Sequence, residues 1–435
     1  MSPKKESPSN ILIVLSLAIG IAFLLLLFVG PELVKSRLQG WNISSDNPGQ
    51  IGDVFGGTLG PFIAIIAAIL TFAAFWVQYE ANKLQKEQFN EQARNFAIER
   101  FEGRFFDLIK IHRENVLEMQ LNLTVIGNKS TQQKEQLNIR GPEVIKLVAK
   151  QVLECKEEIT PYFSRKNLTQ FYKKEFLDKL NNESTISKRN INLRHLAIND
   201  IAWCITFFGL DFNGFYIVKK NLEQKYKPSF FEPFLNYLSL KPFENSENWY
   251  SWRKLKRSKN NKRKLIITDM ILKKRRSKNF ESPFSDIDLN SFYFTDDNQR
   301  YYGGFQLQLG HYFRHLYQTV NFVNDQEFLD YKLKYNYVKT LRAQLSTLEQ
   351  VIFYYNSLSS LGNIWELVVS KRFEKNNNPV THKELLNKQL ITKYNLIKNM
   401  PDRQLFKQEF AAFYPDIDFE YQDSQMKRRN NSLYV

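Results

Sequence analysis

Two histidines, an arginine and an amide share one side of a segment that is predicted to be helical. The segment is Tyr301–Asp325, with the sequence YYGGFQLQLGHYFRHLYQTVNFVND. At 3.6 residues per turn its apolar residues form one arc, and His311, Arg314, His315 and Gln318 form the opposite arc. Such side chains can bind a phosphate or move a proton at a phosphodiester. These four residues are therefore the candidate catalytic residues.

The same residues have an alternative, structural role. Histidines with aromatic neighbours often form hydrogen bonds between packed helices. The pair His311 and His315 has a spacing that can also bind zinc, but no third ligand is apparent, and the charge of Arg314 would repel the metal. We expect no metal and no cofactor, and the sequence leaves phosphate chemistry and helix packing both open.

A strongly basic block covers Arg253–Lys278 and contains 13 Lys or Arg residues against one acid, Asp269. Such charge attracts phosphates of nucleic acid or of anionic lipid headgroups. The alternative is a solvated loop, and the aromatic residues just upstream do not discriminate between these partners. The candidate binding residues are Arg253, Lys254, Lys256, Arg257, Lys262, Arg263, Lys264, Lys273, Lys274, Arg275 and Arg276.

Two uncharged apolar stretches precede these residues, Ile11–Val29 with 19 residues and Val54–Tyr79 with 26. Each is long enough to cross about 30 Å of hydrocarbon as a helix. A cleaved signal peptide is the alternative for the first stretch, but its apolar run is long and no small-x-small cleavage site follows it before Gly30. The sequence therefore predicts a transmembrane hairpin.

The second stretch contains a stripe of small residues every four positions, Gly52, Gly56, Gly60, Ala64 and Ala68. Faces of small residues let membrane helices approach closely. The stripe is predicted to pack either against the first span of the same chain or against another copy. A proline at position 61 offers a further alternative, in which the helix begins there and the glycines form a re-entrant turn.

Charge predicts the orientation of the hairpin. Residues 1–79 contain four basic and four acidic residues, so the formal charge of +16 belongs to the remainder of the chain. Because positive residues stay on the cytoplasmic side, we expect both termini in the cytoplasm and a multi-pass membrane protein. The two cysteines, Cys155 and Cys204, give no disulfide framework, which fits a reducing compartment.

The predicted fold class is mainly α, a two-helix transmembrane hairpin followed by a predominantly helical cytoplasmic domain with loop-rich insertions. The predicted domains are residues 1–10 as a short cytoplasmic N-terminus, 11–29 and 54–79 as spans, 30–53 as an external loop, 80–423 as the helical domain with a basic insertion at 253–278, and 424–435 as a polar tail.

Within the helical domain, periodicity predicts the main elements. A long helix continues from Glu80 to about Leu123, and few strands are expected. The further expectations are a polar linker at Gly127–Gly141, helices at Pro142–Lys156 and Leu168–Leu180 with a break at Pro161, core at Ile191–Val218, a loop-rich stretch at Phe230–Trp252 and an amphipathic helix at Arg342–Leu361.

Three stretches carry a resemblance to a known family. They are GDVFGGTLGPF at Gly52–Phe62, FEGRFFDLIKIHRENV at Phe101–Val116 and GGFQLQLGHYFRHLYQTVNFV at Gly303–Val323, and the helix AQLSTLEQVIFYYNSL at Ala343–Leu358 has the same character. With these stretches the chain resembles the putative phage abortive infection protein family of bacteria. The resemblance implies an inner-membrane protein of antiphage defence with a mostly helical cytoplasmic domain, and it supplies no catalytic residues.

Two functions from different classes follow. The first is a non-enzymatic membrane-anchored effector or sensor, whose basic domain senses infection and whose hairpin then oligomerises and perturbs the membrane. The second is a membrane-tethered ribonuclease or nucleotide-binding enzyme that uses His311, Arg314 and His315. Against an enzyme, the chain has no P-loop, no dinucleotide-binding turn, no carboxylate metal motif and no GxSxG elbow. The expected partners are the lipid bilayer, further copies of the chain, nucleic acid or anionic lipid, and a phage-derived or system component.

Overall fold

Two compact units make up the chain, Met1–Arg100 and Phe101–Val435. The computed structural model describes residues 48–126, 134–183, 189–244, 249–257, 261–276, 300–366, 389–401 and 410–420, together with short runs between 20 and 40. In the described part helices dominate, so the predicted mainly α class is confirmed at that level.

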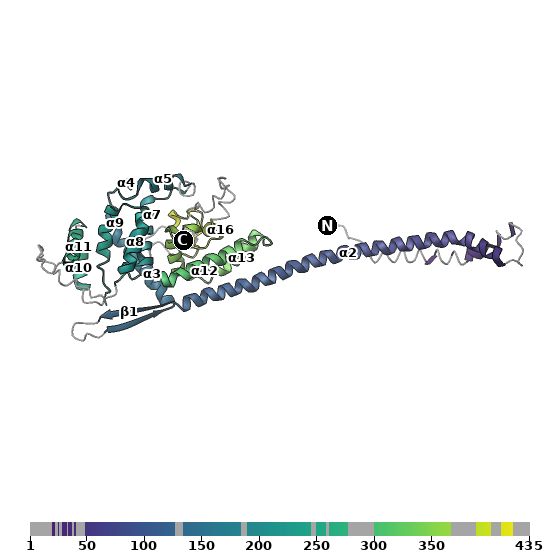
Figure 1. The fold of residues 1–435 in the computed structure, drawn as a ribbon, viewed down its shortest axis with the longest axis horizontal. Coiled ribbons are helices and arrows are strands. Elements are labelled where there is room, and N and C mark those ends of the chain that lie inside the picture. The colour runs from purple at the N-terminus through teal and green to yellow at the C-terminus, as the bar shows by residue number, and fades with distance from the viewer. Residues whose placement is uncertain are drawn as a thin grey trace, which may run out of the picture. The chain divides into compact units, whose positions relative to one another are not determined.

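Helix α2 is the longest element and runs without interruption over Pro48–Leu117 (Figure 1). Its apolar part contains large exposed side chains such as Phe62, Phe72 and Phe75. Among the described helices, α2 is long and apolar enough to cross a membrane. Exposed apolar surface of this size is costly in water, so it favours contact with lipid.

The helix begins at Pro48 and continues through Pro61, so the re-entrant turn considered for the glycines is wrong. A proline in the first turn costs nothing because that N–H has no helical partner, and a later proline removes a single backbone bond. Most of the first apolar stretch, 11–29, lies outside the described residues. The two-helix hairpin therefore stays a prediction.

The second unit begins with the C-terminal end of α2 and a β-hairpin. Strands β1 (Gln120–Ile126) and β2 (Lys134–Arg140) pair antiparallel, with Gln120 opposite Arg140. The predicted helix end near Leu123 and the predicted polar linker are therefore wrong. The strand partner satisfies the backbone of a polar segment such as β2, and this pairing is not visible in the composition of the segment.

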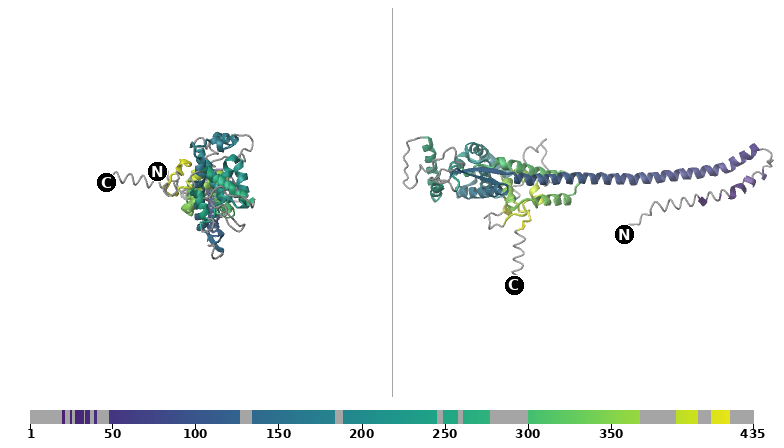
Figure 2. Two further views of the ribbon diagram at one scale, coloured as in Figure 1. Left: turned by 90° about the vertical axis from the view of Figure 1, so that its left-hand side faces the viewer. Right: turned by 90° about the horizontal axis from the view of Figure 1, so that it is seen from below.

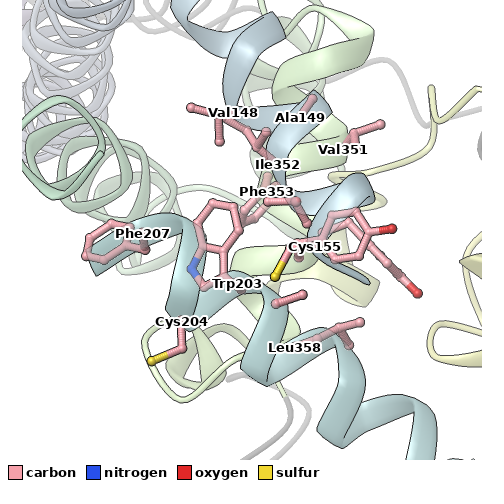
Figure 3. Close-up of a cluster of buried hydrophobic side chains, with 14 of the residues drawn as sticks. Val148, Ala149, Cys155, Trp203, Cys204, Phe207, Val351, Ile352, Phe353 and Leu358 are labelled. Atoms are coloured by element: carbon pink, nitrogen blue, oxygen red, sulfur yellow. The ribbon is translucent and has the colours of Figure 1, made fainter. Parts of the chain in front are cut away.

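Three helices distant in sequence form the centre of the core. They are α3 (Pro142–Phe163), α7 (Leu193–Phe208) and α14 (Thr347–Leu358). Figure 3 shows Val148 and Cys155 of α3, Trp203 of α7 and Ile352 of α14 together in this cluster. Helix α7 is buried on almost every side, which confirms the part of the predicted core at 191–218 that this helix covers, whereas Asp211, Asn213 and Tyr216 beyond it are exposed.

The remaining described helices surround this centre. They are α4 (Leu168–Phe171), α5 (Lys174–Asn182), α8 (Phe212–Glu223), α9 (Pro228–Leu238), α10 (Trp249–Arg257), α11 (Asn261–Arg276), α12 (Gln306–Asn324), α13 (Tyr331–Arg342), η2 (Asn363–Trp365), α16 (Leu390–Tyr394) and η4 (Phe410–Ala412). Helices α10 and α11 lie at one end of this unit and α12 and α13 at the other (Figures 1 and 2).

Three expectations about these helices are corrected. The stretch predicted as loop-rich, Phe230–Trp252, is helical up to Leu238 and again from Trp249, because Pro228 fits the first turn of α9 and buried Phe231 and Phe234 stabilise that helix. Pro161 lies inside the last turns of α3 and does not break it. The helix predicted at 342–361 is shorter than expected: it is α14, which begins at Thr347 after a capping box and ends at Leu358, whereas Arg342 is the last residue of α13.

A contact between two glycines places the start of α12. Gly304 has φ +89° and Gly209 has φ +82°, and a Cβ at Gly304 would lie 2.6 Å from the carbonyl oxygen of Phe208. The Phe305 N–H donates to the Phe207 carbonyl at 2.8 Å. Only residues without a Cβ allow the chain to pass this close to the end of α7 in this conformation.

Gly304→Ala is expected to destabilise the protein by at least about 2 kcal/mol, because it combines a left-handed backbone with a clash. Gly310→Ala is the matched control, since a Cβ there meets no described atom within 4 Å. In the interior of α12 this control should stabilise by about 0.5–1 kcal/mol. Thermal unfolding of the detergent-solubilised chain measures both, and equal effects would contradict the role of the glycine contact.

Candidate functional site

The predicted catalytic face lies on α12, and its apolar arc is buried as expected. His311, Arg314 and Gln318 are exposed, whereas His315 is half-buried. The Nε2 atom of His315 lies 2.8 Å from the carbonyl oxygen of Leu108 in α2 and therefore donates a hydrogen bond to it. Three of the four candidate catalytic residues therefore lie at the surface. The fourth, His315, forms a hydrogen bond between α12 and α2.

A buried histidine that the sequence analysis did not select lies beside His315. His112 of α2 is 1% exposed, and its ring stacks near that of His315 with the centroids 6.3 Å apart. Its Nε2 atom lies 3.6 Å from Oε1 of Glu349 in α14. Among the described residues, neither ring nitrogen of His112 has a partner at hydrogen-bond distance.

The carboxylate of Glu349 contacts His112, the Ser346 N–H and the Tyr312 hydroxyl. It accepts from the Ser346 N–H at 2.8 Å as part of the capping box, and from the Tyr312 hydroxyl at 3.1 Å. Burial alone would raise the pKa of Glu349, but His112 and Ser346 hold this pKa below its ordinary value. The carboxylate is therefore charged at neutral pH and holds α2, α12 and α14 together.

The sequence contained a local signal for both His112 and Glu349. His112 lies in the resembling stretch 101–116, and Ser346 with Glu349 has the Ser-x-x-Glu spacing of a capping box. Only the packing of the helices shows that they meet. Because the pair is buried, it is inaccessible to a substrate in this conformation and acts as a polar link.

Replacing Glu349 tests this link. Glu349→Ala should destabilise the protein by about 2–4 kcal/mol, since it removes a cap and leaves the buried Tyr312 hydroxyl unpaired. Glu349→Gln keeps an acceptor and should cost less. Thermal unfolding measures both, with the exposed Glu143→Gln, expected within about 0.5 kcal/mol of the parent, as the control.

The pH dependence of this effect has a definite sign. The pKa of Glu349 is lowered in the folded state. The carboxylate therefore stabilises the fold above its unfolded pKa of about 4.3, and this contribution is lost as the pH falls through the folded pKa. The difference in unfolding temperature between the parent and Glu349→Gln should be largest near neutrality and shrink below about pH 4. A constant difference would contradict the assignment.

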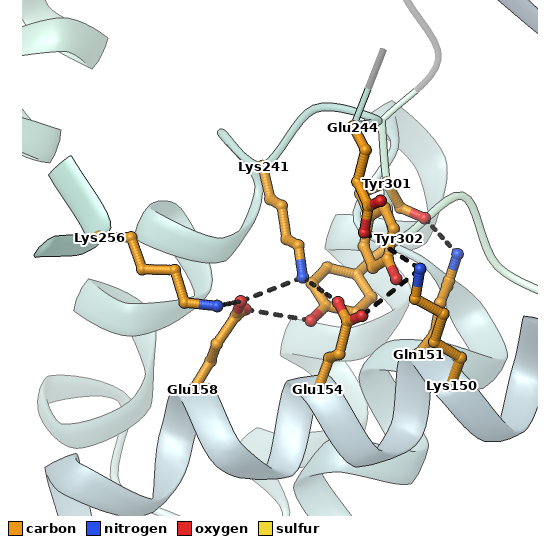
Figure 4. A network of polar contacts seen from close by, with 9 residues as sticks. All are labelled: Lys150, Gln151, Glu154, Glu158, Lys241, Glu244, Lys256, Tyr301 and Tyr302. Carbon is orange, nitrogen blue, oxygen red and sulfur yellow. Dashed lines mark hydrogen bonds and ion pairs between the residues drawn. The ribbon is translucent and has the colours of Figure 1, made fainter. Parts of the chain in front are cut away.

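A second buried cluster surrounds Lys241 (Figure 4). Its Nζ atom lies 2.6 Å from Glu154 and 3.0 Å from Glu158, both on α3, and its side chain is 1% exposed. Tyr302 donates to Glu158 at 3.1 Å. Burial would raise the pKa of Glu154, but Lys241 lowers it overall. Two carboxylates and their lysines neutralise one another here, as buried charges require.

The basic block is helical where the structure describes it, so the solvated-loop alternative is wrong. Trp252 and Leu255 of α10 and Ile267 of α11 are buried, and Trp252 stacks on Tyr237 of α9 with centroids 4.6 Å apart. This apolar side fixes both helices to the domain, and their basic side faces outward.

The individual cations of the block differ in environment. Arg253, Lys254, Arg257 and Lys262 are exposed, and Arg263 and Lys264 are half-buried. Lys256 forms an ion pair with Glu158 at 3.2 Å, which joins it to the Lys241 cluster. Burial lowers the pKa of Lys264. Lys273, Lys274, Arg275 and Arg276 lie in α11, and their side chains are outside the description.

A small pocket of about 70 Å³ is lined by α5, by α7, by Lys225 and Tyr226 after α8, and by the end of α14. Its buried carboxylate, Asp200, is fully engaged by Lys225 at 2.7 Å, by the Tyr226 hydroxyl at 2.7 Å and by the Ser360 N–H at 3.0 Å. None of the residues predicted to do chemistry lines this pocket. Across the described ranges, no group of three His, Cys, Asp or Glu residues could hold a metal ion.

In its described residues the molecule is mainly helical, with one candidate membrane-spanning helix and a basic helical surface. A family model described as putative phage abortive infection protein matches residues 304–373. This match begins at Gly304 and includes α12, α13 and α14, so the resemblance found in the sequence is confirmed over this segment. No curated protein and no solved structure matches the chain.

Proposed function

We propose that the protein is a membrane-anchored effector or sensor of bacterial antiphage defence, acting by abortive infection. The similarity of residues 304–373 to abortive infection proteins supports a role in phage defence. In this proposal the chain resides in the inner membrane as a multi-pass protein with both termini in the cytoplasm. Its basic helical domain detects infection, and its membrane segment oligomerises and perturbs the bilayer.

The continuity of α2 carries this proposal. The apolar part of this helix is a candidate span. Further along the same helix, Phe101, Phe105 and His112 are buried among the helices of the second unit. Because α2 is continuous in sequence and secondary structure between these parts, we propose that a rearrangement of the domain core is passed along it to the membrane segment.

The small-residue stripe is the proposed surface of association. In the described part of the chain, no atom lies within 4 Å of a Cβ added at Gly52, Gly56 or Gly60. By contrast, a Cβ at Gly30 would lie 3.2 Å from Leu59, which is off the stripe. The stripe can therefore accept a second helix at close range, and larger side chains there would hold that helix away.

The double substitution Gly56→Leu with Gly60→Leu should abolish protection against phage while leaving expression and membrane insertion intact. The matched control is Gly57→Leu, because Gly57 is also open but points to a different side of the helix. Plating efficiency of a phage panel and a membrane-potential dye measure the effect. Retained protection and depolarisation in the double variant would refute association along the stripe.

A second candidate function is a membrane-tethered ribonuclease or nucleotide-binding enzyme. It is supported by the exposure of His311, Arg314 and Gln318 on one side of α12. Under this alternative, His311→Ala with Arg314→Ala should abolish protection and keep cellular RNA intact during infection. Both side chains are exposed, so the variant should fold. Depolarisation that precedes any RNA cleavage, and protection unchanged in this variant, would exclude the enzyme.

A further inference from the structure

One outward face of α10 combines an aromatic ring with three cations. Tyr250, Arg253, Lys254 and Arg257 follow the spacing i, i+3, i+4 and i+7, which places them on one side of a helix. These four residues are called the α10 face. Tyr250 is 67% exposed, and the Nζ atom of Lys254 lies 4.9 Å from the centre of its ring.

The cations of the α10 face are not used inside the protein. In the part of the chain that the structure describes, no carboxylate lies at ion-pair distance from Arg253, Lys254 or Arg257. Lys256, one residue from this face, is instead engaged by Glu158 at 3.2 Å. Within the described residues, the helix thus separates one lysine that is ion-paired from three cations that are not.

We propose that the α10 face binds single-stranded nucleic acid. The three cations would contact successive phosphates, and Tyr250 would stack on an unpaired base. A duplex offers phosphates but no free base faces, so an exposed tyrosine beside the cations favours a single strand. This inference rests on the proposed function and names the class of molecule that the helical domain senses.

An anionic bilayer fits this face less well. A helix that binds in the interface of a bilayer inserts its apolar side among the lipids. The apolar side of α10 is unavailable for insertion, because Trp252 and Leu255 are fully buried against the domain. Trp252 is also stacked on Tyr237. The outward face has a single aromatic side chain, which suits stacking better than insertion.

The full chain in phosphatidylcholine nanodiscs provides the direct test. Fluorescence anisotropy is measured with labelled oligo(dT) and oligo(U) of about 12 nucleotides, a length in the range of single-strand sites. The expected result is binding that weakens with salt, with a logarithmic slope that includes about 2 from the three cations. Comparison of the two strands shows whether DNA or RNA is preferred.

Substitutions on the α10 face separate its two contributions. Replacing Arg253, Lys254 and Arg257 together by Ala should weaken binding at least about tenfold and reduce the salt slope by about 2. Tyr250→Ala should weaken binding by about 5- to 150-fold with the slope unchanged, since stacking releases no counterions. Circular dichroism should be unaltered because all four side chains are exposed.

Matched controls exist for both changes. Tyr216 on α8 is also 67% exposed, and Tyr216→Ala should bind as the parent does. The exposed Lys174, Lys332 and Lys339 replaced together by Ala remove the same charge elsewhere. If these controls lose as much binding as the α10 variants, the affinity comes from diffuse charge and the proposal is wrong.

Three further outcomes would overturn the inference. The first is that no oligonucleotide binds, and the second is that a duplex of the same length binds equally well. The third is that vesicles containing phosphatidylserine bind through the α10 face while oligonucleotides do not bind.

Failure of the proposed function can be told apart from failure of this inference. If Gly56→Leu with Gly60→Leu keeps protection while oligonucleotide binding stands, only the association mechanism is lost. If that variant loses protection while no oligonucleotide binds, only the inference about α10 is lost.

Discussion

The packing of one short part of α2 against the helical unit is the interaction on which the remaining features depend. Phe101 stacks on Phe322 of α12 with centroids 5.2 Å apart and meets Tyr337 of α13 edge-on at 4.9 Å. Eleven residues further along α2, the Nε2 atom of His112 lies 3.6 Å from Oε1 of Glu349. Because apolar and polar contacts both lie on this side of one helix, the C-terminal part of α2 and the domain core cannot rearrange independently.

Charge has two different uses in this protein. Two buried charge clusters are compensated: Lys241 lies between Glu154 and Glu158, and Asp200 is held by Lys225. Desolvation makes such compensation necessary, so these groups maintain the fold. On α10, exposed cations remain in water at little cost and are available to a polyanion. Lysine therefore has a structural role where it is buried and paired, and the proposed binding role falls to cations that are exposed.

Much of the fold could be predicted because its signals are local. The apolar run at 54–79, the amphipathic period of α12 and the apolar core helix α7 are each evident within one segment. The hairpin β1–β2 and the division between α13 and α14 were not predicted. A strand depends on its partner for its backbone bonds, and the capping box at Ser346 competes with a helical pattern that continues across it.

The sequence by itself determined that α2 contains a span-like apolar segment, that α12 has a polar side with His311 and Arg314, and that the basic excess follows the apolar stretches. Each depends on composition or on the helical period, which neighbouring residues set. Tertiary structure alone decided that His315 bonds to α2, that His112 meets Glu349, and that Lys256 is paired with Glu158, whereas Arg253 has no ion-pair partner among the described residues. Those roles depend on which helix faces pack together. Contacts between residues distant in sequence, such as Gly209 with Gly304, determine that packing.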